Sequence, residues 1–211
     1  MAKHIIFDLD GTLIDSKEEI LNTYQIVFNE IKPQVINLAL INYGATLQDV
    51  LSNVYGEERD KIEKAKIMFS TIYDGSDYHQ TNLYDNVLKA LTYLKTKKYN
   101  MYVATNKRHV PTLKILNHKN LSDFFSDVIT SDIRVERVLS KAEMISELKK
   151  KYAFSDGFMV GDTSSDIKAG NIENLKTIAV TYGYENRDIF AHCNPSYTID
   201  SFDEIIKIVE T

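Results

Sequence analysis

The chain has 211 residues, a formal net charge of −5, and 44% hydrophobic and 26% charged residues. This is the composition of an ordinary globular protein, with one domain or one domain carrying a smaller insertion. The negative charge disfavours a nucleic-acid backbone as the main partner. Cys193 is the only cysteine, so no intramolecular disulfide can form, which fits a reducing cytoplasm. The first apolar run is interrupted by Asp8, too early for a signal peptide or a membrane span, so we expect no membrane partner.

The first part of the chain is predicted to be one strand followed by a block of helices. The apolar run at residues 4–7 ends at an Asp-x-Asp-Gly loop, which is typical of a buried strand. Ser16 and Glu19 have the spacing of a capping box and predict a helix start. Apolar spacing predicts helices at 16–31, 35–42, 47–54 and 57–73, and no strand pattern is seen up to about residue 82.

From residue 84 onward, strands and helices alternate. The predicted strands are 100–104, 127–130, 157–160 and 176–180, and the predicted helices are 85–97, 110–117, 140–152, a short one after Thr163 and one from Ser201. This alternation predicts an α/β fold with a doubly wound parallel sheet. Because the first strand precedes the helical block, we expect residues 1–15 and 83–211 to form the core and residues 16–82 an inserted helical cap.

Two carboxylates stand at the end of the first strand. Strand alternation points Asp8 and Asp10 the same way, and Gly11 permits a sharp turn beside them. The carboxyl ends of strands are where open α/β sheets bind ligands. Taken alone, the pattern also fits a strand end with two solvated acids; three later segments favour a site.

The next two segments are candidates for binding an anion. Thr105 and Asn106 end the predicted strand 100–104, just before a helix, where a hydroxyl and backbone amides can hold an anion. An ordinary helix cap is the alternative there. Ser140 and Glu143 form a capping box that places Lys141 in the first helical turn. A cation opposes the helix dipole at that position, so Lys141 is either selected to pair with an anion or is a surface lysine.

The fourth segment ends another buried strand with an acid. Asp162 can share a cation with Asp8, whereas Asp166 also fits a capping box with Thr163. Hard oxygen ligands without a Cys/His cluster favour Mg²⁺. The chain contains neither a Gly-x-Ser-x-Gly elbow nor a Gly-x-x-x-x-Gly-Lys loop, which argues against a serine hydrolase and a P-loop enzyme.

Together these segments resemble the haloacid dehalogenase (HAD) superfamily, in its phosphoglycolate-phosphatase-like branch with a helical cap. The resemblance spans essentially the whole chain and rests on Asp8-Leu9-Asp10-Gly11-Thr12, then Thr105, Lys141, and Gly161-Asp162 with Asp166. The late Tyr182-Gly183-Tyr184 also resembles that branch. The chain departs from the family pattern at Ala142, where many relatives have proline, and in residues 133–139, which lack the usual proline-rich loop.

The resemblance implies a Mg²⁺-dependent phosphatase acting on a small phosphorylated metabolite through an aspartyl phosphate. Asp8 would be the nucleophile, with a pKa kept low by Mg²⁺ and Lys141, and Asp10 the general acid and base. Gly11, Thr105, Asn106, Lys141 and, in the cap, Gly44 would bind substrate; Asp8, Asp10 and Asp162 would hold Mg²⁺, with Asp166 behind them. We expect a cytoplasmic monomer or homodimer.

Three other functions are compatible with parts of the pattern. A phosphomutase would use the same residues. A dehalogenase characteristically lacks the second acid, and here Asp10 is present. A non-catalytic phosphate-binding module usually loses one of the four motifs, and all four are present.

Overall fold

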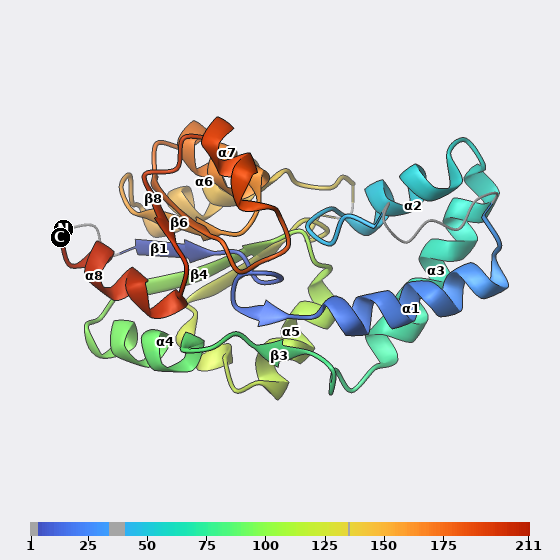
Figure 1. The fold of residues 1–211 in the computed structure, drawn as a ribbon, viewed down its shortest axis with the longest axis horizontal. Helices are drawn as coiled ribbons and strands as arrows, with labels where there is room; N and C mark the ends of the chain where they lie inside the picture. The colour runs from blue at the N-terminus through green and yellow to red at the C-terminus, as the bar shows by residue number, and fades with distance from the viewer. Residues whose placement is uncertain (1–3, 34–40, 135) are drawn as a thin grey trace. The chain divides into compact units, whose positions relative to one another are not determined.

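The computed structural model describes residues 4–33, 41–134 and 136–211 (Figure 1). The chain forms two compact units, one of Met1–Asp15 with Leu83–Thr211 and the other of Ser16–Asn82. The larger unit contains the six-stranded sheet and the smaller one is helical.

The larger unit is built on a six-stranded sheet in the order β5-β4-β1-β6-β7-β8, and every pairing in it is parallel. The strands are β1 (His4–Phe7), β4 (Asn100–Thr105), β5 (Asp127–Thr130), β6 (Phe158–Gly161), β7 (Lys176–Val180) and β8 (Tyr197–Ile199). The predicted doubly wound parallel sheet is therefore confirmed. The strand order reverses at β1, and such a reversal opens a crevice at the carboxyl ends of the strands.

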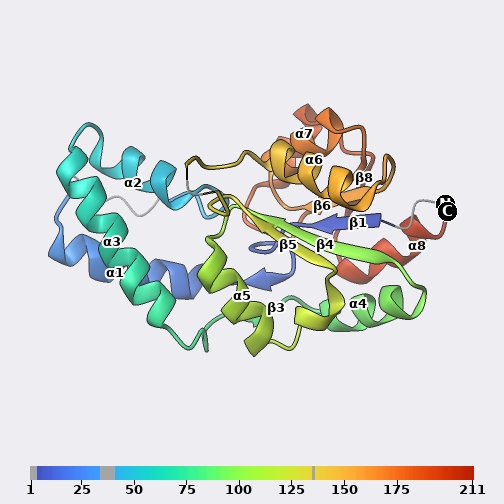
Figure 2. The same cartoon turned by 180° about the vertical axis from the view of Figure 1, so that it is seen from behind.

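Helices cover both faces of the sheet in Figures 1 and 2. The helices α6 (Lys141–Tyr152) and α7 (Ser164–Ile172) lie on one face; α4 (Val87–Thr96), α5 (His109–His118) and α8 (Ile205–Val209) lie on the other. Short 3-10 turns at η2 (Ser122–Phe124), η3 (Arg187–His192) and η4 (Phe202–Glu204) complete the unit.

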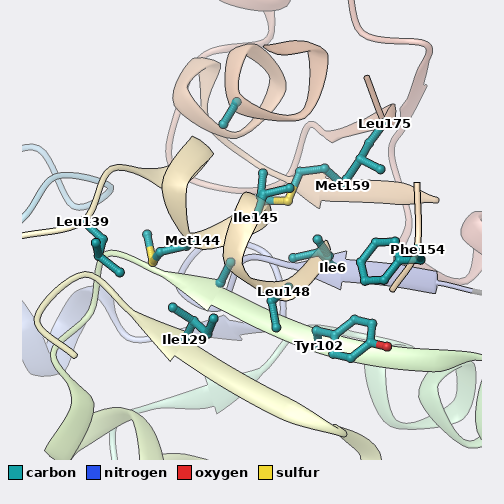
Figure 3. Close-up of a cluster of buried hydrophobic side chains, with 12 residues drawn as sticks. Ile6, Tyr102, Ile129, Leu139, Met144, Ile145, Leu148, Phe154, Met159 and Leu175 are labelled. Carbon is teal, nitrogen blue, oxygen red and sulfur yellow. The ribbon is translucent and has the colours of Figure 1, made fainter. Parts of the chain in front are cut away.

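A buried apolar cluster joins α6 to the sheet (Figure 3). Ile6, Tyr102 and Met159, from three adjacent strands, pack with Ile145 and Leu148 of α6. Because side chains alternate along a strand, the residue two positions after Ile6 faces the same helix. That residue is Asp8, so packing of α6 brings its first turn to the Asp8 carboxylate.

The smaller unit contains α1 (Lys17–Glu30), α2 (Leu47–Tyr55) and α3 (Arg59–Gly75), with α3 packed against both others. Its core is aromatic: Tyr24 stacks on Phe28, and Phe69 stacks on Tyr73. The helix predicted at 35–42 falls mostly on residues 34–40, which lie outside the described residues, and residues 41–42 are not helical.

One predicted helix cap is wrong. Ser16 makes no side-chain capping bond to α1. Glu19 is instead buried, where it accepts hydrogen bonds from the Ser76 hydroxyl and from the Gln80 amide at 3.1 Å. A buried carboxylate gains more from these two tertiary donors than from an exposed local capping bond.

Three short strands were not predicted. β2 (Ile14–Asp15) and β3 (Asn82–Leu83) form a two-stranded sheet, and β8 adds three residues to the edge of the main sheet. Strands of two or three residues are too short to show an alternating pattern. The final predicted helix begins as the turn η4 and becomes α-helical only at Ile205.

Candidate active site

The first group of site residues is centred on Lys141. The Lys141 Nζ lies 2.5 Å from Asp8 Oδ1 and 2.9 Å from Asp166 Oδ1, and it donates to the Ala104 carbonyl at 2.9 Å. Asp8 is held in place by its own backbone, because its N–H donates to the Val160 carbonyl of β6 at 2.9 Å. One ammonium thus joins the ends of β1 and β4 to the start of α7.

Lys141 is not a surface lysine. Its side chain is only 4% exposed, although it occupies the first turn of α6. The predicted capping box of Ser140 and Glu143 is confirmed, and it provides the acid that this helix start favours. The cation therefore opposes the helix dipole but has two carboxylates as partners. Of the two interpretations that the sequence left open, this is the lysine that pairs with an anion.

Asp166 forms the predicted helix cap and also makes a contact that was not predicted. Its carboxylate accepts hydrogen bonds from the Thr163 N–H at 3.1 Å and the Thr163 hydroxyl at 2.6 Å, forming the predicted capping box of α7. Its other oxygen pairs with Lys141. The helix cap therefore also fixes the lysine.

Asp162 is held by neutral donors. The Thr12 hydroxyl donates to Oδ1 at 3.1 Å, and the Tyr184 amide donates to Oδ2 at 2.8 Å. Gly11, with φ +80°, lies so close that a Cβ there would be 2.1 Å from Asp162 Oδ2. A Cβ on Gly183 would likewise be 2.2 Å from the Cβ of Asp162. Two glycines thus let the chain close around this carboxylate.

Asp10 has a lysine of its own. The Lys107 Nζ donates to Asp10 Oδ1 at 2.9 Å, and the two side chains are 5% and 9% exposed. The Lys107 N–H donates to the Thr105 hydroxyl at 3.1 Å, and the Ser131 hydroxyl donates to the Asn106 carbonyl at 2.9 Å. Thr105 and Asn106 therefore sit in a well-anchored loop at the end of β4.

Burial is the largest influence on the pKa values of Asp8 and Asp162. It raises the pKa of Asp8 to about 7, more than the Lys141 ammonium lowers it. We expected Lys141 and Mg²⁺ to keep this pKa low; the Lys141 contribution is smaller than the cost of burying the charge. Burial and the neighbouring Asp8 also raise the pKa of Asp162 well above its usual range. Burial lowers the pKa of Lys141, but Asp166 and Asp8 together outweigh it and raise this pKa.

These groups fit a divalent cation. Ligand oxygens of Asp8, Asp162 and Asp166 lie within 4.8 Å of one another, and all three residues are buried. Four buried carboxyl groups, counting Asp10, face the two ammonium groups of Lys107 and Lys141, so when all four are ionised two negative charges remain for a cation to balance. Hard oxygen donors of this kind suit Mg²⁺.

The structure thus brings together, in the larger unit, Asp8, Asp10, Gly11, Thr105, Asn106, Lys141, Asp162 and Asp166. Gly44 belongs to the helical unit, in the loop before α2, where its N–H donates to Asn42 Oδ1 at 3.0 Å.

Sequence reasoning missed four of the contacts that build the site: Lys141 to Asp166, Lys107 to Asp10, Thr12 to Asp162, and the Tyr184 amide to Asp162. Thr12 directly follows Asp10-Gly11, and Lys107 directly follows Thr105-Asn106, so their places beside these motifs could have identified them as candidates. The Tyr184 contact uses a backbone amide, which no residue type signals.

Comparison with known proteins agrees with this geometry. Residues 5–180 match the model of the haloacid dehalogenase-like hydrolases, and the chain belongs to this family. A Vibrio parahaemolyticus protein named phosphoglycolate phosphatase is 26% identical over 98% of this chain and 96% of its own length. A Bacillus cereus protein named pyrophosphatase PpaX is 27% identical over 97% and 95%. The crystal structure of a predicted phosphatase from Clostridium acetobutylicum superimposes with a TM-score of 0.89 at 26% identity, covering both chains completely.

The chain is therefore a hydrolase of the haloacid dehalogenase-like family, with relatives named as phosphatases. Among the residues that the structure describes, no helix is both long and apolar enough to span a membrane.

Proposed function

We propose that this protein is a Mg²⁺-dependent phosphatase that hydrolyses a small phosphoglycolate-like monoester through an aspartyl phosphate on Asp8. The observation that carries this proposal is Lys141, a buried ammonium that contacts Asp8 and Asp166 where three carboxylates converge. A buried cation beside a nucleophilic carboxylate can neutralise the charge that develops during phosphoryl transfer. The names of the relatives support the same chemistry.

In the first step, an Asp8 carboxylate oxygen attacks phosphorus and the bond from phosphorus to the ester oxygen breaks. Asp10 donates a proton to the departing alkoxide. In the second step, water attacks the phosphorus of the aspartyl phosphate while Asp10 takes the proton back. Inorganic phosphate leaves and the Asp8 carboxylate is restored.

The phosphoryl oxygens would be held by the Thr105 hydroxyl, the Asn106 amide, the backbone near Gly11 and the Lys141 ammonium. Asp8, the Asp10 carbonyl and Asp162 would hold Mg²⁺, while Asp166 acts by orienting Lys141. When bound, Mg²⁺ supplies positive charge against the phosphate and the surrounding acids. Since phosphoryl transfer depends mainly on positioning and charge neutralisation, this small set of groups suffices.

We further assign the helical unit, residues 16–82, as a cap that selects the substrate. The chain passes between the units at residues 15–16 and 82–83, which would act as hinges. The uncharged loop 43–47, with Gly44, is the proposed recognition element. Excising the cap should leave cleavage of a small aryl phosphate intact but erase discrimination among metabolites. If the excised protein keeps the substrate preferences of the full chain, specificity lies outside the cap.

The protein would act in the cytoplasm, as a monomer or homodimer.

Two other reactions, hydrolysis of pyrophosphate and transfer of phosphate within a sugar, must be distinguished from hydrolysis of a monoester. The similarity to pyrophosphatase PpaX makes inorganic pyrophosphate the second candidate substrate, and a phosphomutase would use the same residues. A panel containing nitrophenyl phosphate, phosphoglycolate, pyrophosphate and sugar phosphates, each with Mg²⁺ and with chelator, distinguishes them. We expect Mg²⁺-dependent release of phosphate, and inhibition when Ca²⁺, which prefers more ligands and longer distances, replaces Mg²⁺. Full activity in excess chelator would contradict the metal assignment, and transfer of phosphate to a second position on the sugar would identify a mutase.

A further inference from the structure

Lys107 forms an ion pair that the mechanism above does not use. Its Nζ lies 2.9 Å from Asp10 Oδ1, and both side chains are at least nine-tenths buried. Ordering and burying a lysine is unfavourable unless its charge has a partner. The lysine and the aspartate are 97 residues apart in the chain, so this contact is created by the fold and not by local sequence.

The backbone of Lys107 is held as firmly as its ammonium group. Its N–H donates to the Thr105 hydroxyl at 3.1 Å. The Thr105 carbonyl accepts from the Ser131 N–H at 3.0 Å, and the Asn106 carbonyl accepts from the Ser131 hydroxyl at 2.9 Å. The lysine therefore starts from a fixed loop, which limits the positions that its ammonium and the paired carboxylate can occupy.

The two lysines of the site divide the two N-terminal acids between them. Lys141 contacts Asp8 and Asp166, whereas Lys107 contacts Asp10. Asp8 and Asp10 have different tasks in the proposed reaction, since one forms a covalent bond and the other moves a proton. A separate cation on Asp10 can orient it without altering the nucleophile.

We infer that Lys107 is a positioning residue that holds the Asp10 carboxylate in the direction required for proton transfer. This inference rests on the proposed function, because it assigns Lys107 a task within that reaction. The lysine acts through Asp10 and not on the phosphoryl group or the metal. Loss of Lys107 should therefore slow the steps in which Asp10 moves a proton, with little change in KM or in Mg²⁺ affinity.

A double-mutant cycle tests this inference. Lys107→Met should lower kcat for an alkyl phosphate by about 10- to 100-fold, part of the factor that general acid–base catalysis contributes. The loss should be smaller for formation of the phosphoenzyme from nitrophenyl phosphate, whose leaving group needs little protonation. In an Asp10→Asn background, Lys107→Met should change kcat by less than about twofold, since residues that act as one unit are not additive.

Two matched variants complete the experiment. Lys107→Arg keeps a cation near Asp10 and should recover part of the lost kcat, and it also serves if the methionine variant does not fold. Lys168→Met removes an exposed lysine of α7 and should behave as wild type. Equal losses in the rate of phosphoenzyme formation from aryl and alkyl phosphates, additive losses in the cycle, or a Lys107→Arg variant as slow as the methionine variant would overturn the inference.

The outcomes also separate this inference from the proposed function. If wild-type protein forms no phosphoenzyme, the proposed function fails. If wild type and Asp10→Asn behave as proposed while Lys107→Met retains wild-type kcat, only the role of Lys107 is contradicted.

Discussion

The two sides of the acidic cluster balance their charge in different ways. Asp8 and Asp166 share the Lys141 ammonium, so their side already contains a buried cation. Asp162 accepts its hydrogen bonds from the Thr12 hydroxyl and the Tyr184 amide, both neutral. Neutral donors orient a carboxylate but cancel little of its charge. This difference supports the proposal that the lysine side holds the transferred phosphoryl group and the Asp162 side holds the metal.

Breaking the lysine side should have the larger effect. Lys141→Ala should raise the activation free energy by about 3 kcal/mol, which lowers kcat/KM over 100-fold, as expected for removing a buried charge that stabilises the transition state. Because Lys141 is buried between two carboxylates, the melting temperature should also fall, and Mg²⁺ should partly restore it. Unchanged activity with a lower melting temperature would indicate a structural lysine only.

Breaking the neutral side should act on the metal instead. Asp162→Asn should raise the Mg²⁺ concentration needed for half-maximal activity by at least about 100-fold, since a direct ligand contributes no less than the groups behind it. Calorimetric titration with Mg²⁺ measures the affinity without turnover. Asp60→Asn, at an exposed position on α3, is the matched control. An Asp162→Asn variant that binds Mg²⁺ normally would remove Asp162 from the metal site.

A milder change can sharpen the same contrast. Thr12→Val keeps the shape of a fully buried residue but removes the hydroxyl that donates to Asp162. We expect Mg²⁺ affinity to fall about tenfold, while Thr12→Ser stays close to wild type. If valine and serine have the same effect, packing around Thr12 matters and its hydrogen bond does not.

The smallest expected effect is on stability as a function of pH. The pKa of Asp8 is raised to about 7 from its usual 3.8, so between these values the folded protein binds more protons than the unfolded chain. Stability in chelator is therefore highest below about pH 4 for this group, falls as the pH rises, and levels off above about pH 7. A bound divalent cation favours the ionised Asp8 carboxylate and must displace its proton at low pH, so Mg²⁺ should increase the melting temperature more at pH 8 than at pH 5, by several degrees. Equal increases at both pH values would contradict this.

Much of the site followed from sequence because it depends on where strands end. Parallel strands bring their carboxyl ends to one edge, so Asp8, Thr105 and Asp162 were predictable as neighbours once their strands were. Lys141 was a candidate because a cation in a first helical turn conflicts with the dipole, but only its burial between two carboxylates excluded a surface lysine.

The remainder depends on tertiary contacts that local patterns do not encode. Ser16 and Ser140 each begin a Ser-x-x-Glu pattern, yet of these two only Ser140 forms a capping box. The Glu19 carboxylate instead accepts hydrogen bonds from Ser76 and Gln80. The pairing of Lys107 with Asp10 joins residues far apart in the sequence and was not predicted. The three residues of β8 are stabilised by pairing with β7, not by their own pattern.

The central claim is that Asp8 forms the covalent bond and Asp10 moves the proton, and one measurement tests it directly. Rapid mixing of Asp10→Asn with nitrophenyl phosphate, followed by mass spectrometry, should show a burst of about one nitrophenolate per enzyme and a phosphate on Asp8 that hydroxylamine removes. Asp8→Asn should show neither. Steady turnover by Asp10→Asn together with a burst from Asp8→Asn would contradict the assignment, as would less than about a tenfold loss of rate in both variants.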